Sequence, residues 1–451
     1  MRLRDLAQET GQAPFHILNY TACGRGKDIA AMWDGSSTSP ARSTAGNYRR
    51  VAFVAHALLP GYLSTDLIDA RLKELGQNWP GQGESPGFIK WLQFPVVPPS
   101  GSGLVPVRVD FYIVPVLAPD FLGASKDGRA YQWSSRVALA AIRGADSEGA
   151  SLTVGWGAMT KVATSHGRDF LNKDAEGLPP FSSTHGDSGT AALVLETVRL
   201  AGFQPGFRVA IIGANGAIGD VVSRSITALR PESILLVGKG DRLGETKNLS
   251  RLQELQGRVE SCVQSGQRTQ VHVHQDKTTA CHDHGSNLVI VATTGMELSP
   301  SDIPVGAVVL DMTTPAACAP HPEWQGRLVL TSGCGEFEPA VVPRGFGQVA
   351  GQRVSDVGMG SRVIWGCTGE TIARAASEWW GHVSGAQIPL DEVEWCLKHF
   401  PRLGFHPQPA LSFGQPTTWS SVREFVRTAT SMRGRSRVAP ATDVVFSRVA
   451  A

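Results

Sequence analysis

The segment 208–237 constrains the fold of this chain more than any other part of the sequence. It begins with the apolar run RVAII, passes through a glycine turn into a helical stretch at 220–229, and ends in the apolar run SILLV. A strand, a glycine turn, a helix and a second strand make one βαβ unit of a parallel sheet. Further strands are predicted at 270–274, 287–292, 307–311 and 327–331. The expected fold class is therefore α/β, with a Rossmann-type doubly wound parallel sheet of six strands.

The glycines of this turn indicate dinucleotide binding. One glycine lets the chain turn sharply off the strand, a second lets backbone approach a pyrophosphate, and a third lets the helix pack close to the sheet. The phosphate is held at the helix N-terminus. A plain tight βα turn is the alternative, and the strands on both sides favour the dinucleotide. The predicted binding residues of the turn are Gly213, Asn215, Gly216, Ala217, Ile218 and Gly219.

The residues after the second strand favour NADPH as the cofactor. An NAD site has an acidic residue there for the ribose, whereas this chain has Gly238 followed by Lys239 and Arg242. Two cations favour a 2'-phosphate, although Asp241 lies between them and a solvated basic loop is the alternative. Thr293 and Thr294, directly after the predicted strand at 287–292, are further predicted cofactor contacts.

The composition is that of a globular protein with a substantial core. Of 451 residues 42% are hydrophobic, and 42 Lys and Arg balance 40 Asp and Glu, which gives no support for a nucleic-acid partner. No run of about 18 apolar residues occurs, so no membrane span is expected. Seven cysteines without a C-x-x-C pair indicate free thiols in a reducing compartment. The expected location is the cytoplasm.

The length predicts about three domains. Strand-like and helical runs alternate from residue 51, and prolines and serines at 178–183 are typical of a joint. The predicted organisation is a partly irregular extension at 1–50, an N-terminal α/β substrate-binding domain at 51–183, a Rossmann NADP(H)-binding domain at 184–366, a C-terminal helical region at 367–420 and an arginine-rich tail at 421–451.

Cys367 is the cysteine most typical of a nucleophile. It lies between two glycines and directly before a strongly helical run, where the positive end of the helix dipole favours the thiolate. Glu370, one helical turn further along, carries a negative charge that partly opposes formation of the thiolate. A small buried hydrophobe is the alternative reading of any free cysteine, and Cys334 is the competing candidate.

Histidines give two further candidates. His56 ends a predicted strand, where it is either an acid or base near neutral pH or a structural histidine. A second group suggests zinc, but its spacing matches no usual structural zinc pattern and a surface location is preferred, so no metal ligand is predicted. The second group is His272, His274, Cys281, His282 and His284.

Seven motifs, in order from about 51 to 410, together resemble the NADPH-dependent long-chain acyl-(acyl carrier protein) reductases, which form fatty aldehydes. They are VAFVAH at 51–56, VPVLAPD at 114–120, VGWGAMT at 154–160, GDSGTA at 186–191, the glycine turn, CTGE at 367–370 and GFHP at 404–407. The chain departs from the family at 187–189, where the family has Asn-Thr-His, and it is longer at both ends.

The resemblance implies that Cys367 attacks a thioester and carries the acyl group, that NADPH delivers hydride, and that an aldehyde leaves. It places Gly157 and Thr160 beside the nicotinamide and His56 near the reacting group. The predicted catalytic residues are Cys367, His56 and Glu370, and the predicted substrate donor is an acyl carrier protein or acyl-CoA.

Two other functions remain open at this stage. One is an NADP-dependent dehydrogenase of the shikimate or amino-acid type, without a covalent step. The other is a protein that binds NADP(H) without turnover. The sequence does not indicate the chain length of an acyl group or the oligomeric state.

Overall fold

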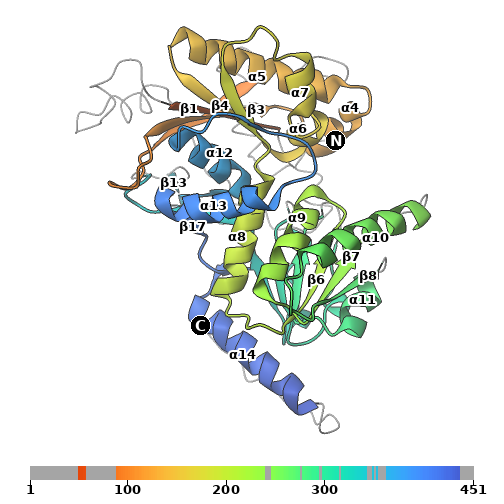
Figure 1. Ribbon diagram of the computed structural model, residues 1–451. Helices are drawn as coiled ribbons and strands as arrows, with labels where there is room; N and C mark the ends of the chain where they lie inside the picture. The colour runs from red at the N-terminus through yellow and green to blue at the C-terminus, as the bar shows by residue number, and fades with distance from the viewer. Residues whose placement is uncertain are drawn as a thin grey trace. The chain divides into compact units, whose positions relative to one another are not determined.

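The computed structural model describes residues 49–56, 88–238, 245–274, 277–293, 297–313, 316–342, 348–349, 352–353 and 362–436 (Figure 1). The chain divides into two compact units. Unit 1 comprises Met1–Ala192 and Cys334–His406, and unit 2 comprises Leu193–Gly333 and Pro407–Ala451. The division therefore falls inside one helix, α8 (Asp187–Leu200).

Unit 2 contains the predicted six-stranded sheet, with all of its strands parallel. The order β11-β10-β9-β6-β7-β8 starts at β6 in the middle and runs outward to both edges, which is the doubly wound arrangement. This confirms the predicted α/β fold class. The strands are β6 (Arg208–Ile212), β7 (Ser233–Val237), β8 (Gln270–His274), β9 (Leu288–Val291), β10 (Val308–Asp311) and β11 (Leu328–Thr331).

Helices of unit 2 cover this sheet because its strands are apolar on both sides. Ala210 and Ile212 of β6 join a core cluster with Ala280 and Cys281 of α11 (Lys277–His284). The intervening residue Ile211 is fully buried as well, so each face of β6 is covered. The other helices of unit 2 are α9 (Ala217–Ser225), α10 (Glu245–Cys262) and α14 (Trp419–Ser436), with short 3-10 helices at Ile226–Leu229, Pro300–Asp302 and Pro322–Trp324.

Unit 1 is built on a second six-stranded sheet in the order β16-β5-β4-β1-β3-β2, parallel except for the pair of β2 and β3. Its strands are β1 (Arg49–His56), β2 (Ile89–Val96), β3 (Val107–Val114), β4 (Ser151–Trp156), β5 (Phe181–Thr184) and β16 (His382–Val383). Its helices are α4 (Ala118–Ser125), α5 (Arg129–Ser147), α6 (Ala158–Ala163), α7 (Arg168–Lys173), α12 (Gly366–Ala376) and α13 (Leu390–Leu403). Helices α4 to α7 lie on one side of this sheet and α12 and α13 on the other (Figure 1).

A small three-stranded sheet of β15 (Val363–Trp365), β12 (Cys334–Phe337) and β17 (Phe405–Pro407), in which β12 and β15 pair antiparallel, leads into α12. Two-stranded pairs complete the described elements: β13 (Gln348–Val349) with β14 (Gln352–Arg353), and β18 (Leu411–Ser412) with β19 (Gln415–Pro416).

Three expectations about the organisation are corrected. The stretch 178–183 is not a joint, because Phe181–Thr184 is strand β5, with four buried residues, inside the sheet of unit 1. Residues 334–406 belong to unit 1, so neither the domain 184–366 nor the region 367–420 is a separate compact body. The start of the predicted tail, up to Ser436, is part of helix α14. Residues 1–48 and 437–451 lie outside the described residues.

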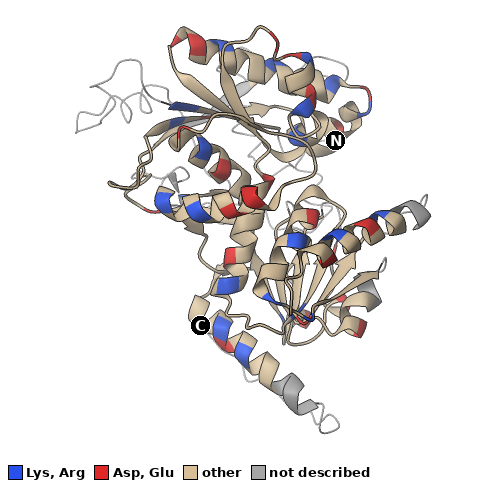
Figure 2. Ribbon diagram, in the orientation of Figure 1, with Lys and Arg blue, Asp and Glu red and all other residues tan. Residues whose placement is uncertain are grey.

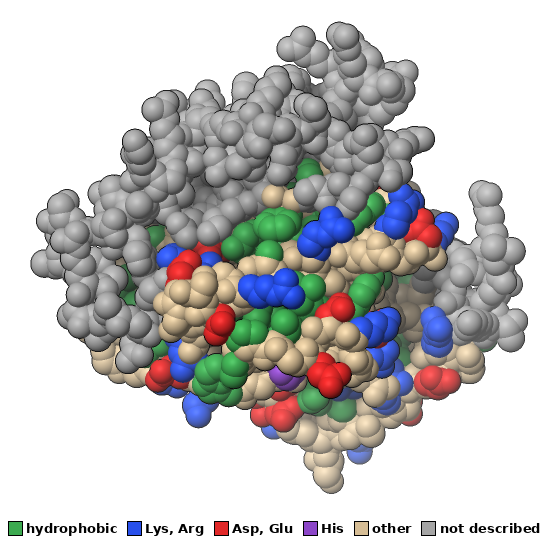
Figure 3. Space-filling view, turned by 90° about the horizontal axis from the view of Figure 1, so that it is seen from above, with side chains coloured by type: hydrophobic (Ala, Val, Ile, Leu, Met, Phe, Trp, Pro, Cys, Tyr) green, Lys and Arg blue, Asp and Glu red, His purple; other side chains and the backbone are tan. Residues whose placement is uncertain are grey.

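Surface charges of both signs are interspersed along the described helices (Figure 2). The described part of the face in Figure 3 likewise carries basic, acidic and apolar side chains side by side. None of the helices in the described ranges combines the length and the apolar character that crossing a bilayer requires.

Two glycine-to-alanine variants in unit 2 test this packing, and they are expected to change stability in opposite directions. A Cβ at Gly219 in α9 would overlap the carbonyl oxygen of Gly213, so Gly219→Ala is expected to destabilise the protein by about 1–3 kcal/mol. A Cβ at exposed Gly257 in α10 meets nothing within 4 Å, and Gly257→Ala is expected to stabilise it by about 0.5–1 kcal/mol. Urea unfolding monitored by circular dichroism measures both. Equal stabilities for the two variants would contradict the proposed packing of α9.

Candidate functional site

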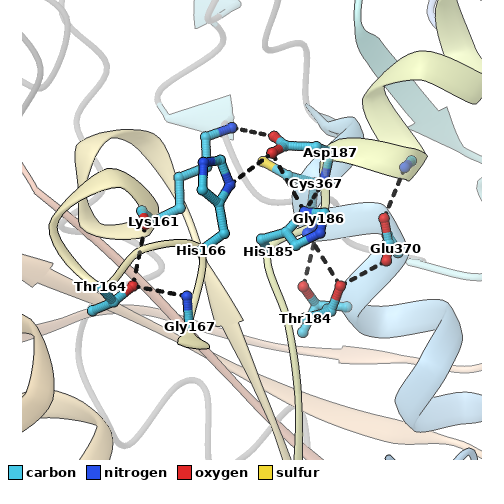
Figure 4. Close-up of polar contacts among 12 residues, drawn as sticks. Lys161, Thr164, His166, Gly167, Thr184, His185, Gly186, Asp187, Cys367 and Glu370 are labelled. Carbon is cyan, nitrogen blue, oxygen red and sulfur yellow. Dashed lines mark hydrogen bonds and ion pairs between the residues drawn. The ribbon is translucent and has the colours of Figure 1, made fainter. Parts of the chain in front are cut away.

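Five polar or nucleophilic side chains of unit 1 meet where β4 and β5 end and α12 begins. Lys161 is in the last turn of α6, and His166 follows that helix in a turn. His185 directly follows β5, and Asp187 is the first residue of α8. Cys367 is the second residue of α12. Figure 4 shows Lys161, the two histidines and Cys367 grouped around the Asp187 carboxylate.

Lys161 and Asp187 form a buried ion pair at the centre of this cluster. The Lys161 ammonium binds Oδ1 of Asp187, whose side chain is fully buried. Burial alone raises the pKa of Asp187, but Lys161 and the two histidines lower it more, and the net pKa lies well below the usual range. Burial lowers the pKa of Lys161, while Asp187 and Cys367 raise it, and the net shift is upward. Both side chains are therefore charged at neutral pH.

The histidines face the second oxygen of the same carboxylate. Nδ1 of His166 lies 3.2 Å and Nδ1 of His185 lies 3.3 Å from Oδ2 of Asp187. The two rings are perpendicular, with centroids 5.5 Å apart. The backbone φ of His166 is +56°, in the left-handed region that histidine, like asparagine and aspartate, adopts more often than most other L residues.

Cys367 is held against the same chain segment by close backbone packing. A Cβ at Gly186 would lie 2.5 Å from Cα and Cβ of Cys367, and a Cβ at Gly366 would lie 2.7 Å from Cα of Thr190. Glycine at 186 and 366 therefore lets the N-termini of α8 and α12 touch. This contact places the half-buried Cys367 thiol beside the ion pair.

The protonation state of Cys367 differs from the expectation. Burial raises the pKa of the Cys367 thiol, the Lys161 ammonium lowers it, the Asp187 carboxylate raises it and the Thr368 backbone N–H lowers it. The net pKa is about 11, above the ordinary value of 9.0. The position at a helix N-terminus was expected to favour the thiolate, but desolvation outweighs it, and the resting protein holds a thiol.

Glu370 anchors α12 instead of facing the thiol. Its two carboxylate oxygens accept hydrogen bonds from Thr184 Oγ1 at 2.6 Å, from the Gly189 backbone N–H at 2.8 Å and from Arg374 Nε at 2.8 Å. Burial raises the pKa of Glu370, but Arg374, His185 and Thr184 lower it, and the net shift is downward. The carboxylate is thus ionised and fully engaged, which is the geometry of a positioning residue.

Packing accounts for the other predicted residues of unit 1. His56 is buried, its ring stacks on Phe121 at 4.4 Å, and its Nε2 accepts the Met159 backbone N–H at 3.1 Å. A Cβ at Gly157 would overlap the Phe53 ring, and Thr160 Oγ1 donates to the Val54 carbonyl oxygen at 2.9 Å. Their predicted roles in catalysis and cofactor binding stay predictions.

The glycine turn of unit 2 has the form that a dinucleotide requires. Gly213 has φ +84°, and a Cβ there would lie 2.6 Å from Cβ of Thr293. Gly216 is exposed at the start of α9, where a Cβ would meet nothing nearer than 3.4 Å, so space for a pyrophosphate is open. Asn215 is exposed, and Ala217 and Ile218 are half-buried in the first turn of α9. The residues present therefore fit the group. Lys239, Arg242 and Thr294 lie outside the described residues.

The competing candidates have ordinary surroundings. Cys334 is buried in β12, where burial and the neighbouring Cys367 raise its pKa to about 12. In the other histidine group, Cys281 is buried and its pKa is raised to about 12 by burial, whereas His272 and His282 are exposed. The surface location predicted for this group thus holds for part of it only.

Sequence reasoning missed Lys161, His166, His185 and Asp187 as a group. Lys161 directly follows the motif at 154–160, and Asp187 lies within the motif at 186–191. Lys161 and Asp187 therefore lie beside or within motifs that the sequence analysis singled out. Their proximity to Cys367 could not be predicted, because 180 residues separate Asp187 from Cys367.

Comparison with protein-family models and with curated proteins finds no match. Among solved structures, the chain is similar to a 2R,3R-butanediol dehydrogenase from Bacillus subtilis, at 16% identity and a TM-score of 0.22, over 32% of this chain and 40% of that one. The similarity to shikimate 5-dehydrogenase from Listeria monocytogenes has 12% identity and a TM-score of 0.32, over 78% of this chain and 96% of that one. The similarity to quinate dehydrogenase from Corynebacterium glutamicum has 13% identity and a TM-score of 0.30, over 85% of this chain and 99% of that one. The chain thus spans less than half of the butanediol dehydrogenase, and scores of this size carry no inference about activity.

The raised pKa of Cys367 predicts how its alkylation depends on pH. Because only the thiolate reacts, a pKa of about 11 predicts that the iodoacetamide rate at Cys367 rises about tenfold per unit from pH 7 to pH 10. Peptide mass spectrometry measures this rate residue by residue. A plateau beginning near pH 9 would show an unshifted thiol.

Replacing Lys161 tests the electrostatic part of this shift. Lys161→Met removes the charge that lowers the Cys367 pKa, so a smaller fraction of the thiol is ionised and the rate at pH 8 is expected to fall severalfold. Lys173→Met, at an exposed lysine in α7, is the matched control and is expected to leave the rate unchanged.

Proposed function

We propose that this protein reduces an acyl thioester to an aldehyde with NADPH, through an acyl group held on Cys367. The observation that carries the proposal is the placement of the Cys367 thiol, at a helix N-terminus and beside the Lys161–Asp187 pair. Of the other described cysteines, Cys281, Cys318, Cys334 and Cys396 are buried and Cys262 lies in unit 2. Cys367 is the described thiol of unit 1 that a substrate can approach.

In the first half of the reaction, the Cys367 sulfur attacks the thioester carbonyl carbon. The bond between that carbon and the carrier sulfur breaks, and the proton of the Cys367 thiol leaves with the carrier thiol, so no proton is gained or lost. The Lys161 ammonium favours the thiolate and the oxyanion that develops on the carbonyl, because both are negative. Asp187 keeps this ammonium in place and charged.

In the second half, the acyl group is reduced and released as an aldehyde. NADPH, when bound at the glycine turn, supplies the hydride. The bond between the acyl carbon and Cys367 Sγ breaks, and the sulfur takes a proton to restore the thiol. Gly213 and Gly219 keep the turn compact, and Gly216 leaves the backbone open to the phosphates. An acyl carrier protein or coenzyme A is the proposed carrier.

The covalent step is tested without cofactor. Incubation with octanoyl-CoA and no NADPH is expected to add one octanoyl group to Cys367, detectable on the intact protein and on its peptide. Cys367→Ala is expected to lose both the adduct and aldehyde formation, whereas Cys262→Ala is the matched control with full adduct. Undiminished aldehyde formation by Cys367→Ala would refute the acyl-cysteine route.

The Lys161–Asp187 pair also supports a second function, reduction of a free carbonyl without a covalent step. A buried, charged ammonium can donate its proton to a carbonyl oxygen as the carbon is reduced, and a thiol with a pKa of about 11 need not take part.

Selective blocking of the thiol separates the two functions. If the second one holds, alkylation of Cys367 leaves NADPH oxidation with a ketone substrate intact, whereas Lys161→Met lowers kcat at least 100-fold. Under the thioester route, alkylation abolishes turnover. Steady NADPH consumption, followed at 340 nm on graded acyl thioesters and on ketones, is the measurement for both.

A further inference from the structure

Asp187, His166 and His185 bring three potential metal ligands together. One ligand atom from each residue lies within 4.8 Å of the others. The two histidine Nδ1 atoms are 3.2 and 3.3 Å from Oδ2 of Asp187. Ligands about 2.1 Å from a metal in a tetrahedral site are about 3.4 Å apart, which these two separations nearly match.

Two buried polar atoms of the cluster lack a hydrogen bond. Within the described part of the chain, Oδ2 of Asp187 and Nδ1 of His166 are buried and make no hydrogen bond, and their 3.2 Å contact with each other is an ion pair only when the histidine is protonated. Asp187 is fully buried, and its other oxygen already binds Lys161. A buried polar atom without a hydrogen bond is costly, so the unmet atoms point to a group that the cluster receives.

His185 adds a second observation. Its Nδ1 accepts the backbone N–H of Asp187 at 3.1 Å, so the nitrogen presents a lone pair in this contact. The lone pair lies 3.3 Å from the unbonded Oδ2, and two acceptors that face each other gain from a cation. Coordination through this nitrogen replaces one neutral hydrogen bond, a small loss beside the binding of a structural metal.

From this geometry we infer that His166, His185 and Asp187 bind a divalent transition-metal ion such as Zn²⁺. Two imidazole nitrogens and one carboxylate oxygen are a donor set suited to zinc and its neighbours, and poorly suited to Mg²⁺ or Ca²⁺. Lys161, bound to Oδ1, is then the outer partner that orients the ligating carboxylate. His166, whose backbone is left-handed, places its Nδ1 3.2 Å from Oδ2 of Asp187.

Three protein ligands leave a coordination position for another molecule. This is the pattern of catalytic zinc sites, in contrast to the closed four-ligand structural sites. The backbone between two of the ligands, at Gly186, packs against Cys367, so the three-ligand cluster lies next to the thiol. The class of ligand that this position accepts is a neutral or anionic oxygen, such as water or a carbonyl. The inference does not rest on the proposed thioester chemistry.

Metal binding to the chelator-stripped full chain tests the site with a readout independent of activity. Titration with Co²⁺ is expected to give visible d–d absorption that saturates at one equivalent and disappears when Zn²⁺ is added. His166→Asn, in which asparagine tolerates the left-handed backbone, and Asp187→Asn are each expected to weaken Co²⁺ binding at least 100-fold. Circular dichroism checks that these variants are folded, and His185→Gln provides a third ligand variant.

Control variants locate the signal. His282→Ala in the exposed part of the other histidine group, and Cys367→Ala, are expected to keep the one-equivalent absorption. Absence of the d–d bands from the native chain, or equal affinity in folded His166→Asn and native protein, overturns the inference. Loss of binding in His282→Ala with retention in Asp187→Asn overturns it too, because the metal then lies in unit 2.

Discussion

The site of unit 1 depends on the close contact between the N-termini of α8 and α12. Two helix N-termini carry partial positive charge and would repel each other if nothing intervened. Here the first residue of α8 is Asp187 and the anchor within α12 is Glu370, so an ionised carboxylate accompanies each end. Glycine makes the approach possible sterically, and the carboxylates make it possible electrostatically.

Glu370 turns this contact into a rigid one. Its partners come from β5, from the start of α8 and from one turn further along α12, so one buried carboxylate ties together three pieces of chain. Arg374 in turn binds Glu392 of α13 and lies over the Trp395 ring at 4.5 Å. The position of Cys367 is thus set by a chain of polar contacts that begins far from the thiol.

The sequence was sufficient to predict the sheet of unit 2 because its signals are local. The apolar runs at 208–212 and 233–237 and the glycine spacing between them lie within 30 residues, and all six strands were predicted. Strand β5 was not predicted, because Phe181-Ser-Ser-Thr184 is polar in composition. Its polar side chains are buried with hydrogen-bond partners, as Thr184 is with Glu370. The cluster around Asp187 could not be read because its members come from three separate stretches. The pKa of Cys367 depends on burial, which no local motif records.

Residues 334–406 belong to unit 1 although they follow the strands of the unit 2 sheet in the chain, and this order affects how the protein folds during synthesis. Lys161 and Asp187 leave the ribosome long before α12, while all six strands of the unit 2 sheet are made in between. A nascent chain that ends before residue 366 therefore has a charged pair whose neighbouring helix α12 does not yet exist. Contacts of such long sequence separation are slow to form, so the unit 2 sheet is expected to form before the Cys367 site is complete.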